Sequence, residues 1–121
     1  MDMRALLGLL LCATLAACSS GEDLLPPMKA YVPPSMPTME AAAKGMTQAA
    51  AEEKLSGAIE MSGLRPADNG PGHYVMCIRG VDSKYNRLHY YAVFFDNDVY
   101  KGSRISVIMD DCERQDYREV P

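Results

Sequence analysis

The chain has little positive charge and few histidines, and each of these shortages excludes a class of function. Twelve Lys and Arg residues stand against 16 Asp and Glu residues, which gives a formal net charge of −4. Nucleic-acid binding calls for a clustered basic surface, so no nucleic-acid partner is expected. His73 and His89 are the only histidines, and no Cys-x-x-Cys or His-x-x-x-His spacing occurs. The sequence therefore predicts no metal site.

The chain also lacks the residue patterns that carry catalysis or cofactor binding. No serine stands in a nucleophile-elbow setting, and Gly70–Gly72 lacks the strand-turn-helix context of a phosphate loop. Asp96–Asp98 resembles the start of a calcium loop, but the turn glycine and the distal glutamate are missing, and a hairpin turn explains it better. We therefore predict that the protein is not an enzyme and has no cofactor. An enzyme with Asp or His chemistry stays open, and it would need a deep pocket that encloses His73 or His89 with a carboxylate.

The apolar run at the start of the chain, Ala5–Leu11, is too short to span a membrane, because a span needs about 20 apolar residues. A short charged start, this apolar run and the small residues before Cys18 form the three parts of an export signal. Asp2 cancels Arg4, so Met3 is the initiator that gives the cleaner signal. A buried N-terminal helix is the alternative interpretation.

The segment Leu15–Cys18 resembles the lipobox of bacterial lipoproteins. In that family a peptidase cuts directly before the cysteine, diacylglycerol is attached to the cysteine sulfur, and the new amino group is usually acylated too. The resemblance implies a signal peptide over residues 1–17 and lipid attachment at Cys18. Two or more acyl chains hold a protein stably on a bilayer, because each buried methylene contributes about 0.8 kcal/mol.

The residue after the acylated cysteine helps to sort proteobacterial lipoproteins, and an aspartate there favours retention at the inner membrane. Ser19 resembles the form that is sent to the outer membrane. We therefore expect a lipid-anchored domain on the periplasmic side of the outer membrane, with the inner membrane as the less favoured site. The lipid itself is the expected membrane contact, since an acidic domain is not attracted to anionic headgroups.

The cysteines predict one disulfide. Cys12 leaves with the signal peptide and Cys18 carries the lipid, so Cys77 and Cys112 are the remaining pair in an oxidising compartment. Closing a loop of about 35 residues stabilises a fold by roughly 3 to 4 kcal/mol in the chain-entropy model. Two free thiols, or a thiolate metal site with His73 or His89, are the alternatives.

Residues 18–37 are predicted to be a tether and residues 38–121 a small periplasmic domain. Five prolines lie between Glu22 and Pro37, and such a segment favours extended polyproline-like structure. Thr38 is a candidate N-cap, and the alanine-rich run after it predicts a helix from about Met39 to Leu55.

The rest of the domain is predicted to be a sheet. Gly57–Leu64 is ambiguous between a short strand and a helix end, and we favour the strand. Short polar connections join the later candidates, which favours an antiparallel meander, and Gly102 marks a candidate bulge. The fold class is therefore α+β, with one N-terminal helix on a three- to four-stranded antiparallel meander sheet stapled by one disulfide. The three later strand candidates are Tyr74–Arg79, Leu88–Phe95 and Val99–Met109.

Four tyrosines on these strands form a candidate interaction face. One helix covers only one face of a small sheet, so the other face would stay partly open, and tyrosines there could bind a protein or a glycan. The alternative is that one set of aromatic side chains packs under the helix while the other lies on a solvated face. The four residues are Tyr74, Tyr90, Tyr91 and Tyr100.

The stretches Gly72–Gly80 and Tyr91–Phe95, with a late cysteine before Tyr117, resemble small lipoproteins of alphaproteobacteria. The resemblance covers most of the mature domain and implies no catalytic or binding residues. The order of a helix followed by antiparallel strands is also similar in outline to small outer-membrane assembly lipoproteins. Those have a second helix, for which this sequence has no pattern.

These features predict a membrane-anchored envelope lipoprotein that acts as a non-catalytic periplasmic protein-interaction module. An envelope protein is the expected partner. The alternative is a periplasmic inhibitor or ligand-binding lipoprotein that captures its target through the exposed tyrosine-bearing sheet face or through the loop Asp68–Gly72.

Overall fold

The computed structural model describes residues 26–121 of the chain. The predicted signal peptide over residues 1–17 and the predicted lipid attachment at Cys18 lie outside the described residues. Residues 26–32 contain no helix or strand and belong to a part separate from the compact unit, which spans Pro33–Pro121. Within the described part of the chain, no helix is both long enough and apolar enough to cross a membrane.

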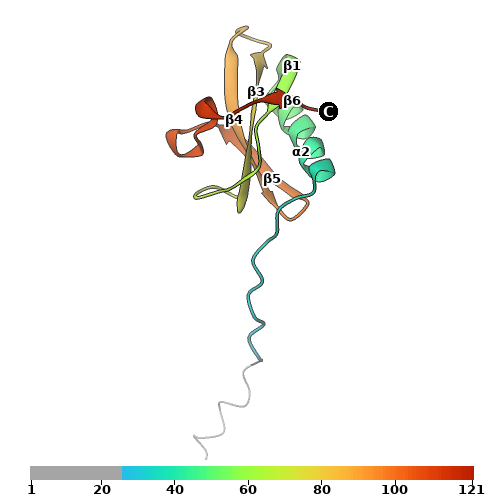
Figure 1. Ribbon diagram of the computed structural model, residues 1–121, viewed down its shortest axis with the longest axis vertical. Helices are drawn as coiled ribbons and strands as arrows, with labels where there is room; N and C mark the ends of the chain where they lie inside the picture. The colour runs from blue at the N-terminus through green and yellow to red at the C-terminus, as the bar shows by residue number, and fades with distance from the viewer. Residues whose placement is uncertain (1–25) are drawn as a thin grey trace, which may run out of the picture. The chain divides into compact units, whose positions relative to one another are not determined.

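The compact unit consists of one α-helix and a six-stranded antiparallel sheet, counted over residues 33–121 (Figure 1). The strand order is β5-β4-β3-β1-β6, and β2 pairs with β3. Two 3-10 turns, η3 and η4, lie between β5 and β6. The bounds are α2 Met39–Glu52, β1 Leu55–Met61, β2 Arg65–Pro66, β3 Tyr74–Asp82, β4 Leu88–Asp96, β5 Val99–Ile105, η3 Ile108–Asp110, η4 Cys112–Arg114 and β6 Arg118–Glu119.

The predicted α+β class, with a helix on an antiparallel sheet and one disulfide, is confirmed, whereas the predicted strand count of three to four is too low. The three strands of the meander β3-β4-β5 begin at the predicted residues, although β3 is longer and β5 shorter than predicted. The additional strands β2 and β6 have two residues each, which is too short to leave a period-2 pattern in the sequence.

Helix α2 begins where the sequence predicted and ends about three residues earlier. Thr38 is the N-cap, and its Oγ1 accepts a hydrogen bond from the backbone N–H of Ala41 at 3.2 Å. The helix ends at Glu52 rather than Leu55, because Lys54 takes a left-handed conformation with a φ of 55° and turns the chain into β1. The ambiguous segment after the helix is therefore a strand over most of its length, as we favoured.

Strand β5 ends earlier than predicted, at Ile105 instead of Met109. Its pairing with β4 places Phe94 opposite Gly102 but Phe95 opposite Tyr100, so Lys101 is an extra residue in β5. Gly102 has a φ of 121°, which side-chain-bearing residues rarely adopt. The predicted bulge at Gly102 is therefore confirmed.

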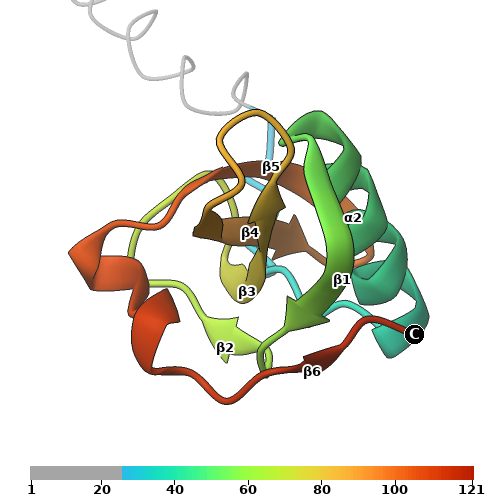
Figure 2. The ribbon, with the colours of Figure 1, turned by 90° about the horizontal axis from the view of Figure 1, so that it is seen from above.

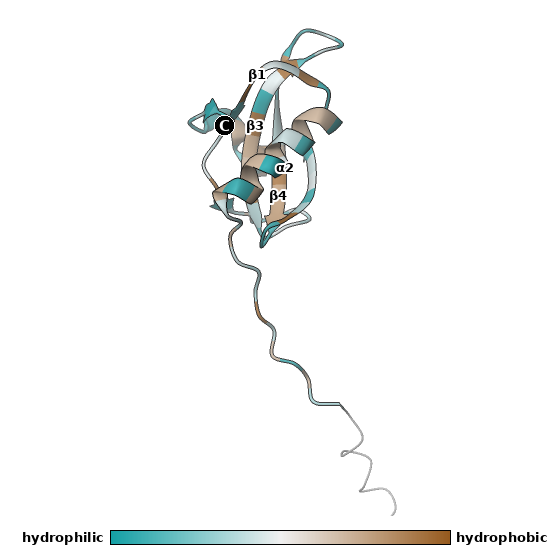
Figure 3. Ribbon diagram, turned by 90° about the vertical axis from the view of Figure 1, so that its right-hand side faces the viewer, coloured by the Kyte–Doolittle hydropathy of each residue, from teal (hydrophilic) through white to brown (hydrophobic). Residues whose placement is uncertain are grey.

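The sheet carries a different core on each face, and α2 covers the larger one (Figure 2). Small residues let the helix approach closely, since a Cβ on Gly45 would lie 2.4 Å from the Phe95 ring. Figure 3 shows α2 crossing in front of β3 and β4, whose ribbons are mostly apolar in colour. The buried residues of this helix-side core are Ala42, Met46, Ala49, Ala50, Met61, Met76, Ile78, Tyr91, Val93 and Phe95.

The second face, which the sequence suggested to be partly open, is covered by the loop before β3 and by the C-terminal segment with its two 3-10 turns. The predicted disulfide Cys77–Cys112 is confirmed, with 5.5 Å between the Cα atoms, and it attaches the C-terminal segment to β3. The loop before β3 also contacts this face, because a Cβ on Gly70 would lie 2.3 Å from the Phe94 ring. The buried residues of this second core are Val75, Cys77, Ala92, Phe94 and Cys112.

The chain before the helix is attached to the turn between β4 and β5. The backbone N–H and the Oγ of Ser35 both donate to Oδ1 of Asn97 at 2.9 Å, and the Asn97 N–H donates to the Ser35 carbonyl at 2.9 Å. The Thr38 N–H donates to Oδ1 of Asp98 at 2.8 Å, and Pro37 is buried. Residues 33–37, assigned to the tether in the sequence, are thus packed as part of the compact unit.

Candidate interaction surface

The four tyrosines of the predicted interaction face lie on two different faces of the sheet. Tyr91 is 8% exposed in the helix-side core, and Tyr74 and Tyr100 pack against that core while partly buried. Tyr90 lies on the second face, where its ring meets the Tyr117 ring at 5.9 Å between centroids. Tyr74, Tyr91 and Tyr100 therefore lie on the helix side of the sheet, as the alternative interpretation proposed for one set. The four tyrosines do not form a single open face.

Burial changes the pKa of two of the helix-side tyrosines. Desolvation raises the pKa of Tyr91 and of Tyr100 above the ordinary value. The Tyr100 hydroxyl donates to Glu52 at 2.7 Å and also lies 3.2 Å from the Ser103 hydroxyl, which links α2 to β5. These tyrosines therefore connect the helix to the sheet.

The two histidines each lie beside a carboxylate, and they lie at opposite ends of β4. Nδ1 of His73 is 2.8 Å from Oδ1 of Asp96, and Nε2 of His89 is 3.9 Å from Oδ2 of Asp82. The His73 backbone N–H also donates to Asp96, and this hydrogen bond contributes most to lowering the pKa of the Asp96 carboxyl. Among residues 26–121, no group of three or more His, Cys, Asp and Glu side chains is placed to bind a metal ion.

Beyond the end of β5, Asp110 organises the chain through a nearly buried carboxylate. Its side chain is 4% exposed and forms an ion pair with Arg104 at 2.8 Å, and its Oδ2 also accepts the N–H of Val107 at 3.0 Å. The Arg104 guanidinium lies 4.9 Å from the centre of the Phe94 ring. Hydrogen bonding to Asp110 raises the pKa of Arg104, so the guanidinium stays charged. The turn between β5 and the disulfide is therefore fixed from inside.

Residues on both sides of Asp110 strengthen this arrangement. Arg65 donates to the Asp110 carbonyl, and Cys112, two residues further along the chain, carries the disulfide. The Tyr117 hydroxyl donates to the Cys112 carbonyl at 2.6 Å, while Arg79 lies 4.4 Å from the centre of the Tyr117 ring. Burial raises the pKa of Tyr117 to about 12, so its hydroxyl remains a donor. Covalent, ionic and aromatic contacts all attach this segment to the second face.

The same segment leaves a group of large apolar side chains in solvent, which we name the apolar ridge. Ile108 is 98% exposed, Met109 is 62% exposed, and Ile105 and Val107 are 59% and 42% exposed. Val107, Ile108 and Met109 are consecutive in the chain and line one depression, so their exposure is contiguous. A contiguous apolar surface beside a polar rim is a common mark of an interaction site.

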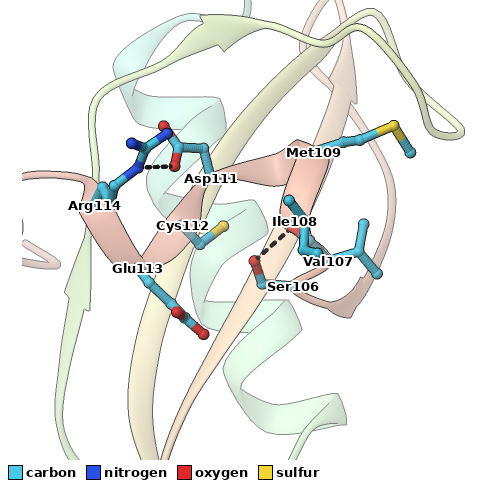
Figure 4. A pocket seen from close by; sticks show the side chains of 8 residues that line it. All are labelled: Ser106, Val107, Ile108, Met109, Asp111, Cys112, Glu113 and Arg114. Carbon is cyan, nitrogen blue, oxygen red and sulfur yellow. Dashed lines mark hydrogen bonds and ion pairs between the residues drawn. The ribbon is translucent and has the colours of Figure 1, made fainter.

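The ridge borders a shallow depression of about 650 Å³. Figure 4 shows Met109 and Val107 at one end of the depression and the Arg114–Asp111 ion pair, 2.6 Å long, at the other. Neither histidine contributes to its lining. The lining residues are Ser106, Val107, Ile108, Met109, Asp111, Cys112, Glu113 and Arg114.

The ridge was not predicted from the sequence, because Val107–Met109 was expected to be the end of a strand, where alternate apolar residues would face a core. One feature could have found it: three consecutive apolar residues stand directly before Asp110-Asp111. A half-buried strand alternates, so three apolar residues in succession place at least one side chain in solvent.

The chain matches no protein-family model, no curated protein and no solved structure. Its own residues are therefore the basis for every inference about its function.

Proposed function

We propose that the chain is a membrane-anchored envelope lipoprotein that acts as a non-catalytic periplasmic protein-interaction module. The observation that carries the proposal is the apolar ridge, which buried contacts fix in an exposed position. Ile108 and Met109 are each worth about 1.5 to 3 kcal/mol when fully transferred out of water. A partner that covers them gains this free energy without having to order the ridge, because Asp110 and the disulfide have already ordered it.

The anchor and the compartment rest on the chain's first residues. The segment Leu15–Cys18 has the lipobox pattern, and Ser19 has the type associated with the outer membrane. The Cys77–Cys112 disulfide agrees with an oxidising compartment such as the periplasm. We therefore place the compact unit on the periplasmic side of the outer membrane, held by lipid on Cys18.

The second candidate is a periplasmic inhibitor or ligand-binding lipoprotein. The depression of about 650 Å³ beside the ridge favours it, since its volume falls within the range of small-molecule sites. In this proposal the target binds at residues 106–114, and the predicted tyrosine face has no part, because Tyr74, Tyr91 and Tyr100 pack against the helix-side core.

The anchor is tested by expressing the full chain in a diderm bacterium and separating its membranes. We expect an outer-membrane product whose N-terminus is an acylated Cys18, and a Cys18→Ala variant that is neither cleaved at this site nor acylated. Mass spectrometry of the N-terminal peptide provides the measurement. A soluble, unacylated wild-type product would contradict the anchored lipoprotein.

The interaction role is tested in the same cells with a ridge variant, Ile108→Ser with Met109→Ser. Val99→Ser is the matched control, because Val99 is 57% exposed at the end of β5 opposite to the ridge. Chemical crosslinking of the acylated proteins should give a defined heterologous adduct for the wild type and the control but not for the ridge variant. An adduct that survives the ridge variant unchanged would remove the ridge from the proposed function.

A further inference from the structure

Strand β5 is an edge strand, and its two halves differ in how they are protected against pairing. Among the described residues, β5 pairs with β4 on one side and with no strand on the other. Its first half carries the extra residue Lys101 and the bulge at Gly102, two features that discourage another strand from adding. Its second half, Ser103–Ile105, has no bulge and leads directly into the apolar ridge.

The direction of the backbone groups in this second half follows from the pairing register. The Ser106 N–H donates to the Tyr90 carbonyl at 2.9 Å, and Arg104 stands opposite Ala92. Backbone groups alternate sides along an antiparallel strand, so Arg104 and Ser106 direct theirs toward β4. Ser103 and Ile105 therefore direct their N–H and C=O groups outward, away from the sheet.

We infer that the partner of the ridge is an extended segment of another protein, which adds as a strand to Ser103–Ile105 and covers Ile105, Ile108 and Met109. Main-chain hydrogen bonds to the outward groups give this mode its affinity, and alternate side chains give it specificity. The expected partner segment therefore alternates apolar and polar residues. The inference rests on the proposed function and adds the kind of partner to it.

A second copy of this chain is a poor occupant, because each symmetric pairing of the edge meets an obstacle. A pair centred on Arg104 sets Arg104 against Arg104 of the other copy, and like charges directly opposite destabilise a sheet. A pair centred on Ile105 needs the Val107 N–H, which already donates to Asp110. A pair centred on Ser103 sets Ile105 against the bulged Lys101.

A lipid surface is also a poor occupant. Glu113 is exposed on the rim of the depression beside the ridge, and the neighbouring Asp111 is balanced by its ion pair with Arg114. The carboxylate of Glu113 at this position repels anionic headgroups. The free backbone groups of Ser103 and Ile105 would moreover find no partners among acyl chains, whereas a protein strand supplies them.

The test uses the full-length chain, purified in mild detergent, and a displayed library of short peptides. Peptides selected on the wild type are made twice, once normally and once with N-methyl groups on alternate amides, which removes the donors along one edge. The protein variants are Ile108→Ser with Met109→Ser, and the matched control Val99→Ser, since Val99 is 57% exposed on the protected half of the same strand. Binding is measured by titration calorimetry.

We expect selected peptides with alternating apolar residues, about tenfold weaker binding to the ridge variant, unchanged binding to the control, and about tenfold weaker binding after N-methylation on one edge only. Binding that depends on the ridge but ignores N-methylation would overturn strand addition and leave the proposed function in place. A library without ridge-dependent binders would overturn both. Ridge-dependent dimerisation, or binding to neutral or anionic vesicles, would replace the protein partner by a second copy or by lipid.

Discussion

The two faces of the sheet are covered in opposite ways. On one face, α2 packs a row of small residues and Met46 directly onto the strands, and the contacts are mainly apolar, with hydrogen bonds from Tyr100 and Ser103 at the end of the helix. On the other, the C-terminal segment and a loop supply little apolar area and depend on a disulfide, the Arg104–Asp110 ion pair and a buried tyrosine hydroxyl. A helix satisfies its own backbone and needs only apolar contact, whereas an irregular segment needs fixed polar partners to stay in place.

The largest loss of stability should come from removing the Cys77–Cys112 disulfide, which attaches the C-terminal segment to the second face. A Cys77→Ala and Cys112→Ala double variant should lose about 3 to 4 kcal/mol of unfolding free energy, because the unfolded chain regains the entropy of a loop of about 35 residues. Urea unfolding followed by circular dichroism measures the loss. A reductant should destabilise the wild type but leave the double variant unchanged, and equal stability of the two proteins would refute the role given to the disulfide.

The next largest loss of stability should come from breaking the Arg104–Asp110 ion pair, which holds the same C-terminal segment. Asp110→Asn removes the charge that Arg104 faces while keeping an oxygen for the Val107 N–H, and the loss should be about 1.5 to 3 kcal/mol. Asp111→Asn is the matched control, since its partner Arg114 is 83% exposed and such a pair contributes about 1 kcal/mol or less. The same urea series compares the two variants, and an equal cost for both would mean that burial does not distinguish these pairs.

On the helix face, the free energy of unfolding should depend on side-chain volume and not on charge. A Gly45→Ala substitution sets a methyl group against the buried Phe95 ring, and overpacking of about 1 to 3 kcal/mol exceeds the gain of about 1 kcal/mol in helix propensity. The expected net loss is about 1 kcal/mol in the free energy of unfolding. Gly63→Ala, with no atom within 4 Å of the new methyl, should change stability by less than about 0.5 kcal/mol.

The smallest effect should fall on the turns at the ends of β4, outside both covers. The backbone N–H groups of Lys84 and Tyr85 lower the pKa of Asp82, and hydrogen bonds from His73 lower that of Asp96. A carboxyl whose folded pKa lies below its unfolded value of 3.8 stabilises the fold above that pH and loses this contribution as the pH falls through the folded pKa. Urea midpoints should therefore drop below about pH 4.

An Asp82→Asn variant should show a smaller acid dependence of the urea midpoint than the wild type. Asp116→Asn, a substitution of an exposed carboxyl, provides the control. If the Asp82 variant followed the wild-type pH curve throughout, the turn would have no part in acid sensitivity.

The sequence predicted the elements that carry their own local pattern. Thr38 before an alanine-rich run predicted the start of the helix, alternation predicted β3, and aromatic and branched residues predicted β4. The disulfide followed from the small number of cysteines. The polar contacts that hold the C-terminal segment on the second face were missed, because they are made by single side chains far apart in the chain, such as Arg65 to Asp110 and Arg79 to Tyr117. Such contacts leave no periodic pattern.

The predicted tyrosine face shows a second limit of prediction from the sequence. Tyr90 and Tyr91 are neighbours on one strand, and successive side chains of a strand point to opposite faces, so the two could never share a face. Period alone cannot decide which face a helix will take, and α2 covers the face of Tyr91. The ridge was missed for a related reason, because β5 stops at Ile105 and the next apolar residues leave the strand.

The attachment of Ser35 to Asn97 has a mechanical consequence. A pull on the chain at Pro33 is resisted first by the three hydrogen bonds between Ser35 and Asn97, before any force acts on the helix. Their rupture would free residues 33–36, up to the buried Pro37, and add at most about 12 Å of reach at about 3.1 Å per residue. The Thr38 N–H stays bound to Asp98, so the fold would keep its N-terminal attachment while the tether lengthens. In an anchored chain, the segment would work as a force-dependent extension with two lengths and one folded domain.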